Sequence, residues 1–175
     1  EGCYWSLTDP DAFYVPHPPG LLRYDVARAH VSEAVAVDGE TRQFHSSADG
    51  QAHSFTLDGA AAAWYRGELR RFPSAVGGYD ECQISKDGRW LLVKEGAGGA
   101  DNRIVDLSTG REWTVPNAAG AVGHSDMGHG YVVGEDDYAN DPGAFRLWTF
   151  SDIGPLIGPL AYRMHGWDAM TRYVS

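Results

Sequence analysis

The chain has 175 residues, of which 43% are hydrophobic and 12% aromatic, a balance that supports a globular core and argues against disorder. Its 14 lysines and arginines against 24 aspartates and glutamates give a formal net charge of −10, which repels nucleic-acid phosphates and anionic membrane surfaces. A nucleic-acid partner is therefore not expected. No membrane span is expected either, because no apolar run approaches the roughly 18 to 20 residues that cross a bilayer.

Two cysteines, Cys3 and Cys82, are too few for a disulfide framework. Cys82 falls in an apolar strand pattern, which favours a buried thiol over a bridged or reactive one. Cysteine usage leaves the compartment open, and a secreted or periplasmic location is the one that we favour.

Strand-like runs separated by turn residues fill the chain as far as Phe72. Two turns stand out, Thr-Asp-Pro-Asp at residues 8–11 and Ser-Ala-Asp-Gly at residues 47–50, because Pro, Asp and Gly suit tight reversals of the chain. The alanines at residues 60–63 are predicted in a strand rather than a helix, since Gly59 and Gly67 bracket them. The predicted strands in this part cover residues 12–15, 21–26, 52–57 and 61–65, and residues 66–72 are predicted as a short turn with a further strand.

Residues 79–116 form a complete predicted module of four strands. An apolar approach over residues 79–84 leads to a Ser-Lys-Asp-Gly turn at residues 85–88, and a glycine-rich loop at residues 96–99 separates the second strand from the third. A Ser-Thr-Gly turn at residues 108–110 precedes the fourth strand. Glycine allows these reversals, and Trp, Val, Ile and Leu fit a pleated surface. The predicted strands after the approach cover residues 89–93, 103–107 and 111–115.

The pattern continues less regularly after residue 117. Ser-Asp-Met-Gly at residues 125–128 is predicted as another copy of the turn, ahead of strands at residues 130–133 and 145–150. Residues 170–175 look like the approach strand of a further unit that stops where its turn would begin. The sequence therefore predicts a fragment of a longer repeat protein.

The turns recur at nearly equal intervals along the chain. Their first residues are Thr8, Ser47, Ser85 and Ser125. An all-β repeat of roughly 40 residues is typical of a propeller blade, which buries its two faces on its neighbours. We expect about four four-stranded blades of a ring of about six to eight, with an irregular β-sandwich as the alternative. The expected repeats cover residues 4–40, 43–78, 79–117 and 118–150, with residues 151–175 leading into a further blade.

The third repeat resembles the WD40-like (PD40) repeat of TolB-type propellers. The resemblance rests on Gln-Ile-Ser-Lys-Asp-Gly-Arg-Trp-Leu-Leu-Val at residues 83–93, followed by Ile-Val-Asp-Leu-Ser-Thr-Gly at residues 104–110. In that family a strand ending in Ser-Pro-Asp-Gly precedes an apolar strand, and a further strand closes in Asp-Leu-x-Thr-Gly. This chain departs from the pattern at Lys86, where Pro is usual. The match extends less closely over residues 4–72 and is weakest over residues 118–150.

The resemblance implies a bacterial propeller but says little about its function, because such propellers serve as protein-binding platforms, peptidase gates and carbohydrate-active domains. We expect a non-catalytic domain that binds a protein partner or a small ligand, such as a carbohydrate, on its loop face. The alternative is a metal-dependent carbohydrate-active enzyme resembling propeller-type oligogalacturonate (polysaccharide) lyases. No organic cofactor is expected, a divalent metal belongs to the second hypothesis, and no catalytic residue is assigned.

Candidate site residues lie near the starts of the repeats, which converge on the axis of a propeller. Imidazole groups there point to a divalent metal or a general base. The candidate metal ligands are His45, His124, His129 and His165. The candidate ligand-binding residues are Glu81, Asp126 and Trp167, the last for stacking on a sugar.

Structural roles compete with these functional ones. His124 and Asp126 also suit turn and inter-blade hydrogen bonding, and the spacing of His124 and His129 matches no recognised metal motif. The acidic run at residues 135–137 favours a solvated loop, with calcium binding through oxygen ligands as the alternative.

Overall fold

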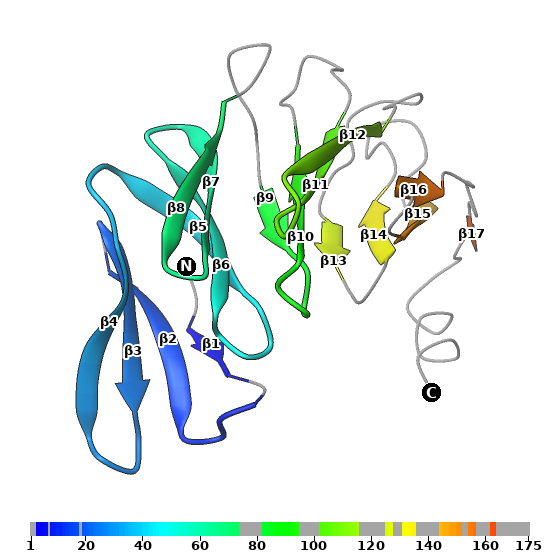
Figure 1. Cartoon of the computed structure of the whole chain (residues 1–175). Helices are drawn as coiled ribbons and strands as arrows, with labels where there is room; N and C mark the ends of the chain where they lie inside the picture. Colours follow the sequence, from blue (N-terminus) through cyan, green and yellow to red (C-terminus); the bar gives the residue numbers. More distant parts are fainter. Residues whose placement is uncertain are drawn as a thin grey trace.

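The structure, a computed structural model, describes residues 3–6, 8–17, 19–73, 82–94, 102–115, 125–127, 131–135, 144–151, 154–156 and 162–163. Within these residues all regular secondary structure is β, and the strands form four antiparallel sheets that follow one another in chain order (Figure 1). The described part contains no helix long and apolar enough to cross a membrane.

Each of the first three sheets is a four-stranded antiparallel meander. The first consists of β1 (Tyr4–Trp5), β2 (Ala12–His17), β3 (Gly20–Asp25) and β4 (His30–Ala36). The second consists of β5 (Thr41–Ser46), β6 (Ala52–Leu57), β7 (Ala60–Tyr65) and β8 (Glu68–Phe72). The third consists of β9 (Cys82–Ile84), β10 (Trp90–Val93), β11 (Asn102–Asp106) and β12 (Arg111–Val115).

The fourth sheet contains β13 (Ser125–Met127), β14 (Tyr131–Glu135), β15 (Ala144–Ser151) and β16 (Gly154–Leu156), with β17 (Tyr162–Arg163) also paired to β15. Because β16 pairs with β15, this sheet extends beyond residue 150, where the sequence pattern ended the fourth repeat. Residues 164–175, which include the expected approach strand, lie outside the described residues.

One turn prediction is wrong. Ser125–Met127 is not a turn but strand β13, in which Met127 pairs with Val132 of β14. Met127 is 1% exposed and packs with Trp90, Leu92 and Ile104 of the third sheet, so burial of its side chain favours an extended conformation. By contrast, the prediction that residues 60–63 belong to a strand is confirmed.

Apolar side chains fill the spaces between successive sheets. One cluster joins the second sheet to the third and includes Ala61, Leu91 and Val105, and another joins the first to the second and includes Leu21 and Phe55. Fully burying a Leu or Val side chain contributes about 1.5–3 kcal/mol, so these clusters hold neighbouring sheets face to face. The first strands of the second, third and fourth sheets are also neighbours, since β9 contacts both β5 and β13.

Cys82 lies within the contact between the second and third sheets. Its thiol is fully buried and donates to the Phe55 carbonyl at 3.2 Å. The prediction of a buried, unbridged thiol is confirmed, and Cys3 is also free and exposed.

Candidate functional site

Two turns of the same sequence pattern have the same hydrogen bonds. In the turn at residues 85–88, the Ser85 amide donates to the Trp90 carbonyl at 2.8 Å, and the Trp90 amide donates to Ser85 Oγ at 2.9 Å. Asp87 Oδ1 accepts hydrogen bonds from the Ser85 hydroxyl and from the Arg89 amide. A serine and an aspartate within the motif thus satisfy the polar groups of the reversal.

The turn at residues 47–50 repeats this pattern. Ser47 and Ala52 exchange the corresponding bonds at 2.9 and 3.0 Å, and Asp49 Oδ1 accepts from the Ser47 hydroxyl and the Gln51 amide. Within each turn, only Oδ1 of the aspartate accepts hydrogen bonds. In the described part of the chain, Oδ2 of Asp49 and of Asp87 has no hydrogen-bond partner, so both oxygens retain the capacity to accept from a ligand.

Hydrogen bonds join these turns across the sheets. The Ala48 amide donates to the Lys86 carbonyl at 2.8 Å, and the Thr8 hydroxyl donates to the Ala48 carbonyl at 3.3 Å. The bond at position 86 uses a backbone carbonyl, which every residue including proline supplies, so this contact does not depend on the Lys86 side chain. The turns of the first three sheets therefore lie along one end of the molecule.

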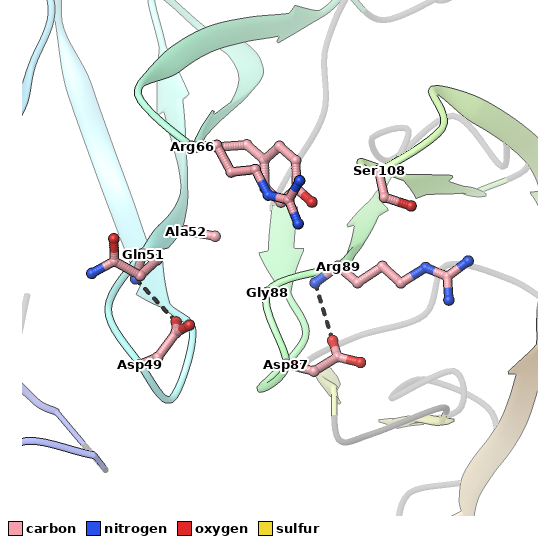
Figure 2. Close-up of a pocket in the computed structure, with 9 residues that line it drawn as sticks. Asp49, Gln51, Ala52, Arg66, Asp87, Gly88, Arg89 and Ser108 are labelled. Carbon is pink, nitrogen blue, oxygen red and sulfur yellow. Dashed lines mark hydrogen bonds between the residues drawn. The ribbon is translucent and has the colours of Figure 1, made fainter.

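A cavity of about 180 Å³ opens at this end, between the second and third sheets (Figure 2). Turn residues and strand ends from both sheets form its wall, and we call it the turn cleft. Its lining residues are Asp49, Gln51, Ala52, Tyr65, Arg66, Asp87, Gly88, Arg89 and Ser108. The two aspartates lie on their separate turns at one side, and Arg66 comes from the β7–β8 turn (Figure 2).

Close contact between the sheets at this point requires glycine. Gly88 has φ +72°, and a Cβ added there would lie 3.2 Å from the Cβ atoms of both Ala52 and Ser47. Because a left-handed φ and a tight contact coincide, glycine at this position allows the two turns to approach and shape the cleft.

Arg89 is already neutralised within the third sheet. Its Nε and Nη2 donate to the Asp106 carboxylate at 3.2 and 2.7 Å, and the Ser108 amide and hydroxyl donate to the same carboxylate. Burial alone would raise the pKa of Asp106, but the hydrogen bonds from Arg89 and Ser108 outweigh it and hold that pKa well below its usual range. Asp106 therefore stays ionised and balances the charge of Arg89.

The second sheet lacks this ion pair. Tyr65 occupies the position equivalent to Asp106, since Tyr65 pairs with Ala52 as Asp106 pairs with Trp90. The Arg66 guanidinium lies 5.1 Å from the centre of the Tyr65 ring, and among the described residues Arg66 forms no ion pair. The turn cleft thus offers two carboxylate oxygens and one cation with unused hydrogen-bonding capacity.

The chemistry of the lining is suited to binding. None of the nine lining residues is histidine or cysteine, and the Ser108 hydroxyl donates to Asp106 rather than to a base that would activate it. No group of three or more His, Cys, Asp or Glu side chains in the described residues is placed to hold a metal ion.

The structure describes two of the residues proposed from the sequence, His45 and Asp126, and neither lines the turn cleft. His45 lies in β5 opposite Ser54, and Asp126 lies in β13 opposite Val133. The remaining candidates lie outside the described residues: Glu81, His124, His129, His165 and Trp167. A metal role for the histidines stays a prediction.

Sequence reasoning assigned Asp49 and Asp87 to turns and overlooked them as binding groups. The repetition of aspartate at the third turn position was the available signal, because equivalent positions of adjacent structural repeats lie side by side. Arg66 gave no such signal, since it shares a cavity with Asp87 only through the packing of two sheets.

A buried histidine lies between the first and second sheets. His53 is 1% exposed, its Nδ1 lies 2.8 Å from Ser46 Oγ, and its ring meets the Tyr14 ring edge-on at 5.2 Å. Burial lowers the pKa of His53 to about 4, so the imidazole is neutral at physiological pH. The His53 imidazole is buried and packs between the two sheets, whereas Ser46 is partly exposed.

No protein family matches the sequence, and no curated protein matches it either. Among solved structures, the chain is similar to hydrazine synthase from Kuenenia stuttgartiensis, with 12% identity and a TM-score of 0.60 over 92% of this chain and 48% of that chain. It is also similar to a Bacteroides uniformis structure assigned as a 6-phosphogluconolactonase, with 15% identity and a TM-score of 0.54 over 93% of this chain and 52% of that one. The chain spans about half the length of these propeller-type neighbours, and at such identities the likeness concerns the fold alone. The chain is an all-β protein with a propeller-like fold.

Proposed function

We propose that this chain is a non-catalytic β-propeller domain that binds a basic group of a protein partner or small ligand in the turn cleft. The observation that carries the proposal is the pair of carboxylates, Asp49 and Asp87, each with an unused Oδ2 on the wall of one cavity. An ammonium or guanidinium group donates to carboxylates through charge-assisted hydrogen bonds, each of which contributes about 1.5–3 kcal/mol.

The other lining groups define the rest of the ligand. Arg66 is a donor, so an acceptor such as a carbonyl or carboxylate placed beside the basic group completes the match. A peptide segment carrying Arg or Lys has both features. The formal net charge of −10 also attracts a cationic partner at long range.

The same proposal includes a closed ring of sheets, of which the second and third sheets around the turn cleft form part. We take the four sheets as successive four-stranded blades of a TolB-type propeller with about six to eight blades. Two observations support this: the sheets follow one another in chain order, and the chain covers 48% and 52% of its two propeller-type neighbours. The buried Asp106 also gives a structural reason for the Asp-Leu-x-Thr-Gly motif, because it caps the turn and pairs with Arg89.

The test uses N-acetyl-arginine amide as the probe, titrated into isotope-labelled chain and followed by NMR. At about 0.3 kcal/mol per heavy atom, a ligand of this size is expected to have a dissociation constant on the order of 1 mM. Shifts should concentrate at the amides of Gln51, Arg66 and Arg89. N-acetyl-glutamate amide, with the opposite charge, should bind at least about tenfold more weakly, a difference of about 1.4 kcal/mol.

Matched variants locate the effect. Asp49→Asn with Asp87→Asn keeps an Oδ1 acceptor for each turn but removes both charges, and it should weaken probe binding at least about tenfold. Glu33→Gln with Asp38→Asn changes the net charge equally at exposed positions that do not line the cleft, and should leave binding within about twofold. Equal weakening by both pairs would overturn the proposal, because it would show a general charge effect.

A further inference from the structure

A row of apolar side chains crosses one face of the first sheet from β1 to β4. The strand register places Trp5 opposite Phe13, Phe13 opposite Tyr24, and Tyr24 opposite Val31. Ring centroids lie 5.2 Å apart for Trp5 and Phe13 and 4.9 Å apart for Phe13 and Tyr24. We call these four residues the first-sheet row.

The row is open to solvent in this chain. Trp5 is 61% exposed and Val31 is 48% exposed. Side chains alternate between the two faces of a strand, so Tyr14 lies on the opposite face from Phe13. That opposite face is covered, because Tyr14, Leu21 and Val35 are buried against the second sheet.

Equivalent positions in the next two sheets are covered. One residue in each of the first three sheets makes the same hydrogen bond: its carbonyl accepts from the amide of the serine that opens the preceding turn. These structurally equivalent residues are Ala12, Ala52 and Trp90. The residues that follow them therefore correspond as well: Phe13, His53 and Leu91. His53 is 1% exposed and Leu91 is fully buried, because the preceding sheet packs on each of them.

We infer that the first-sheet row is the docking surface for one further β-sheet of the same propeller, supplied by a part of the polypeptide outside residues 1–175. The inference rests on the ring proposed above. It continues an observed interface, because the same face of the second and third sheets already receives a neighbouring sheet. This chain covers about half of each propeller-type neighbour, so a protein of their length has enough further residues to form such a sheet.

Two features disfavour other occupants. The rings are tilted by 51° between Trp5 and Phe13 and by 37° between Phe13 and Tyr24, which suits interdigitation with side chains better than stacking of a flat sugar. A second copy of the chain would bring its own formal charge of −10 to the contact, and the two copies would repel each other.

The test compares the native polypeptide that contains this sequence with the chain 1–175, using hydroxyl-radical labelling read by mass spectrometry. We expect labelling of Trp5 and Val31 to fall at least fivefold in the native polypeptide. Leu69, which is 38% exposed on β8 of the second sheet, is the control and should be labelled equally in both. Equal labelling of Trp5 in both samples would overturn the inference, as would a native mass that leaves no room for residues outside 1–175.

A variant provides a second readout. Trp5→Ser with Val31→Thr should lower the thermal midpoint of the native polypeptide by several degrees more than that of the chain 1–175, whereas Leu69→Thr should affect both alike. Protection of Trp5 that rises with the concentration of the chain 1–175 would assign the face to a second copy and overturn the inference. The N-acetyl-arginine amide probe is expected to bind between the second and third sheets, not on the first-sheet row. A failure of the binding proposal would therefore be distinguishable from a failure of this inference.

Discussion

The Arg89 guanidinium donates two hydrogen bonds to the Asp106 carboxylate, whose side chain is 2% exposed. Replacing Asp106 with Ala would leave the guanidinium and the Ser108 amide without their acceptor. We expect Asp106→Ala to lower the free energy of unfolding by about 2–3 kcal/mol, less than for a fully buried pair because the Arg89 side chain is 35% exposed and water can solvate it. Urea denaturation measures this.

The exposed pair Arg103–Glu112 is the matched control. Its atoms lie 3.2 Å apart, but the Glu112 side chain is 44% exposed, so Glu112→Ala should cost less than about 1 kcal/mol. Similar losses of unfolding free energy for both variants would show that burial of Asp106 does not strengthen its ion pair.

Acid should destabilise the chain through His53. Its pKa is about 4 in the folded state against an ordinary value of 6.5, so between these values the unfolded state binds a proton that the folded state does not. Stability is therefore full above about pH 6.5 and falls as the pH drops towards 4, by roughly 3 kcal/mol.

Denaturation curves between pH 7 and pH 4 test this for His53→Gln and His30→Gln. His30 is exposed, so its variant should keep the slope, whereas His53→Gln should lose much of it. A wild-type slope retained in His53→Gln would assign the acid sensitivity to other groups.

Gly50 should tolerate a side chain poorly. Its φ is +67°, and an added Cβ would lie 1.8 Å from Tyr14 Oη, on a ring that is only 4% exposed and has little room to move. Gly50→Ala is expected to destabilise by about 2–4 kcal/mol, through backbone strain and overpacking together. Gly67→Ala isolates the strain, because Gly67 has φ +83° and no atom near the added Cβ, and it should cost only about 1–2 kcal/mol.

Charge in the core between the second and third sheets should be costly. Val105 is 1% exposed, and Val105→Asp would bury an unpaired carboxylate, which we expect to destabilise by several kcal/mol. Val26→Asp is the control, since Val26 is 45% exposed, and thermal melts of the two variants should differ clearly. An unchanged melting temperature for Val105→Asp would contradict the packing of these sheets.

The strands were predictable where local chemistry decided them. Ser85 and Asp87 close a turn through their own side chains, so sequence spacing locates it and the strands on either side. In residues 125–128 the aspartate stands one position earlier, at Asp126, and an apolar Met127 takes its place. The turn bonds are then not available in the same form, and burial of Met127 extends the strand instead.

The first turn shows a smaller shift of the same kind. The sequence pattern aligned Thr8 with Ser47, but Ser6 makes the equivalent bond, from its amide to the Ala12 carbonyl at 3.0 Å. The loop from Ser6 to Ala12 is slightly longer than the loop from Ser47 to Ala52, and an insertion of this kind blurs a repeat period.

The turn cleft could not be read from spacing at all. Arg66 and Asp87 belong to different sheets and share a cavity only because the second and third sheets pack face to face. No short sequence pattern predicts that Arg66 and Asp87 line one cavity. The turn role of Asp87 is predictable, because its hydrogen-bond partners are only two residues away.

The most direct test of the binding proposal is the location of the probe on the chain. Intermolecular nuclear Overhauser effects between the methylene protons of N-acetyl-arginine amide and nearby protons report that location. We expect them at the Ala52 methyl group and the Gly88 α protons, both on the wall of the turn cleft. Effects confined to another surface, such as the ring protons of Trp5 and Phe13, would contradict the account.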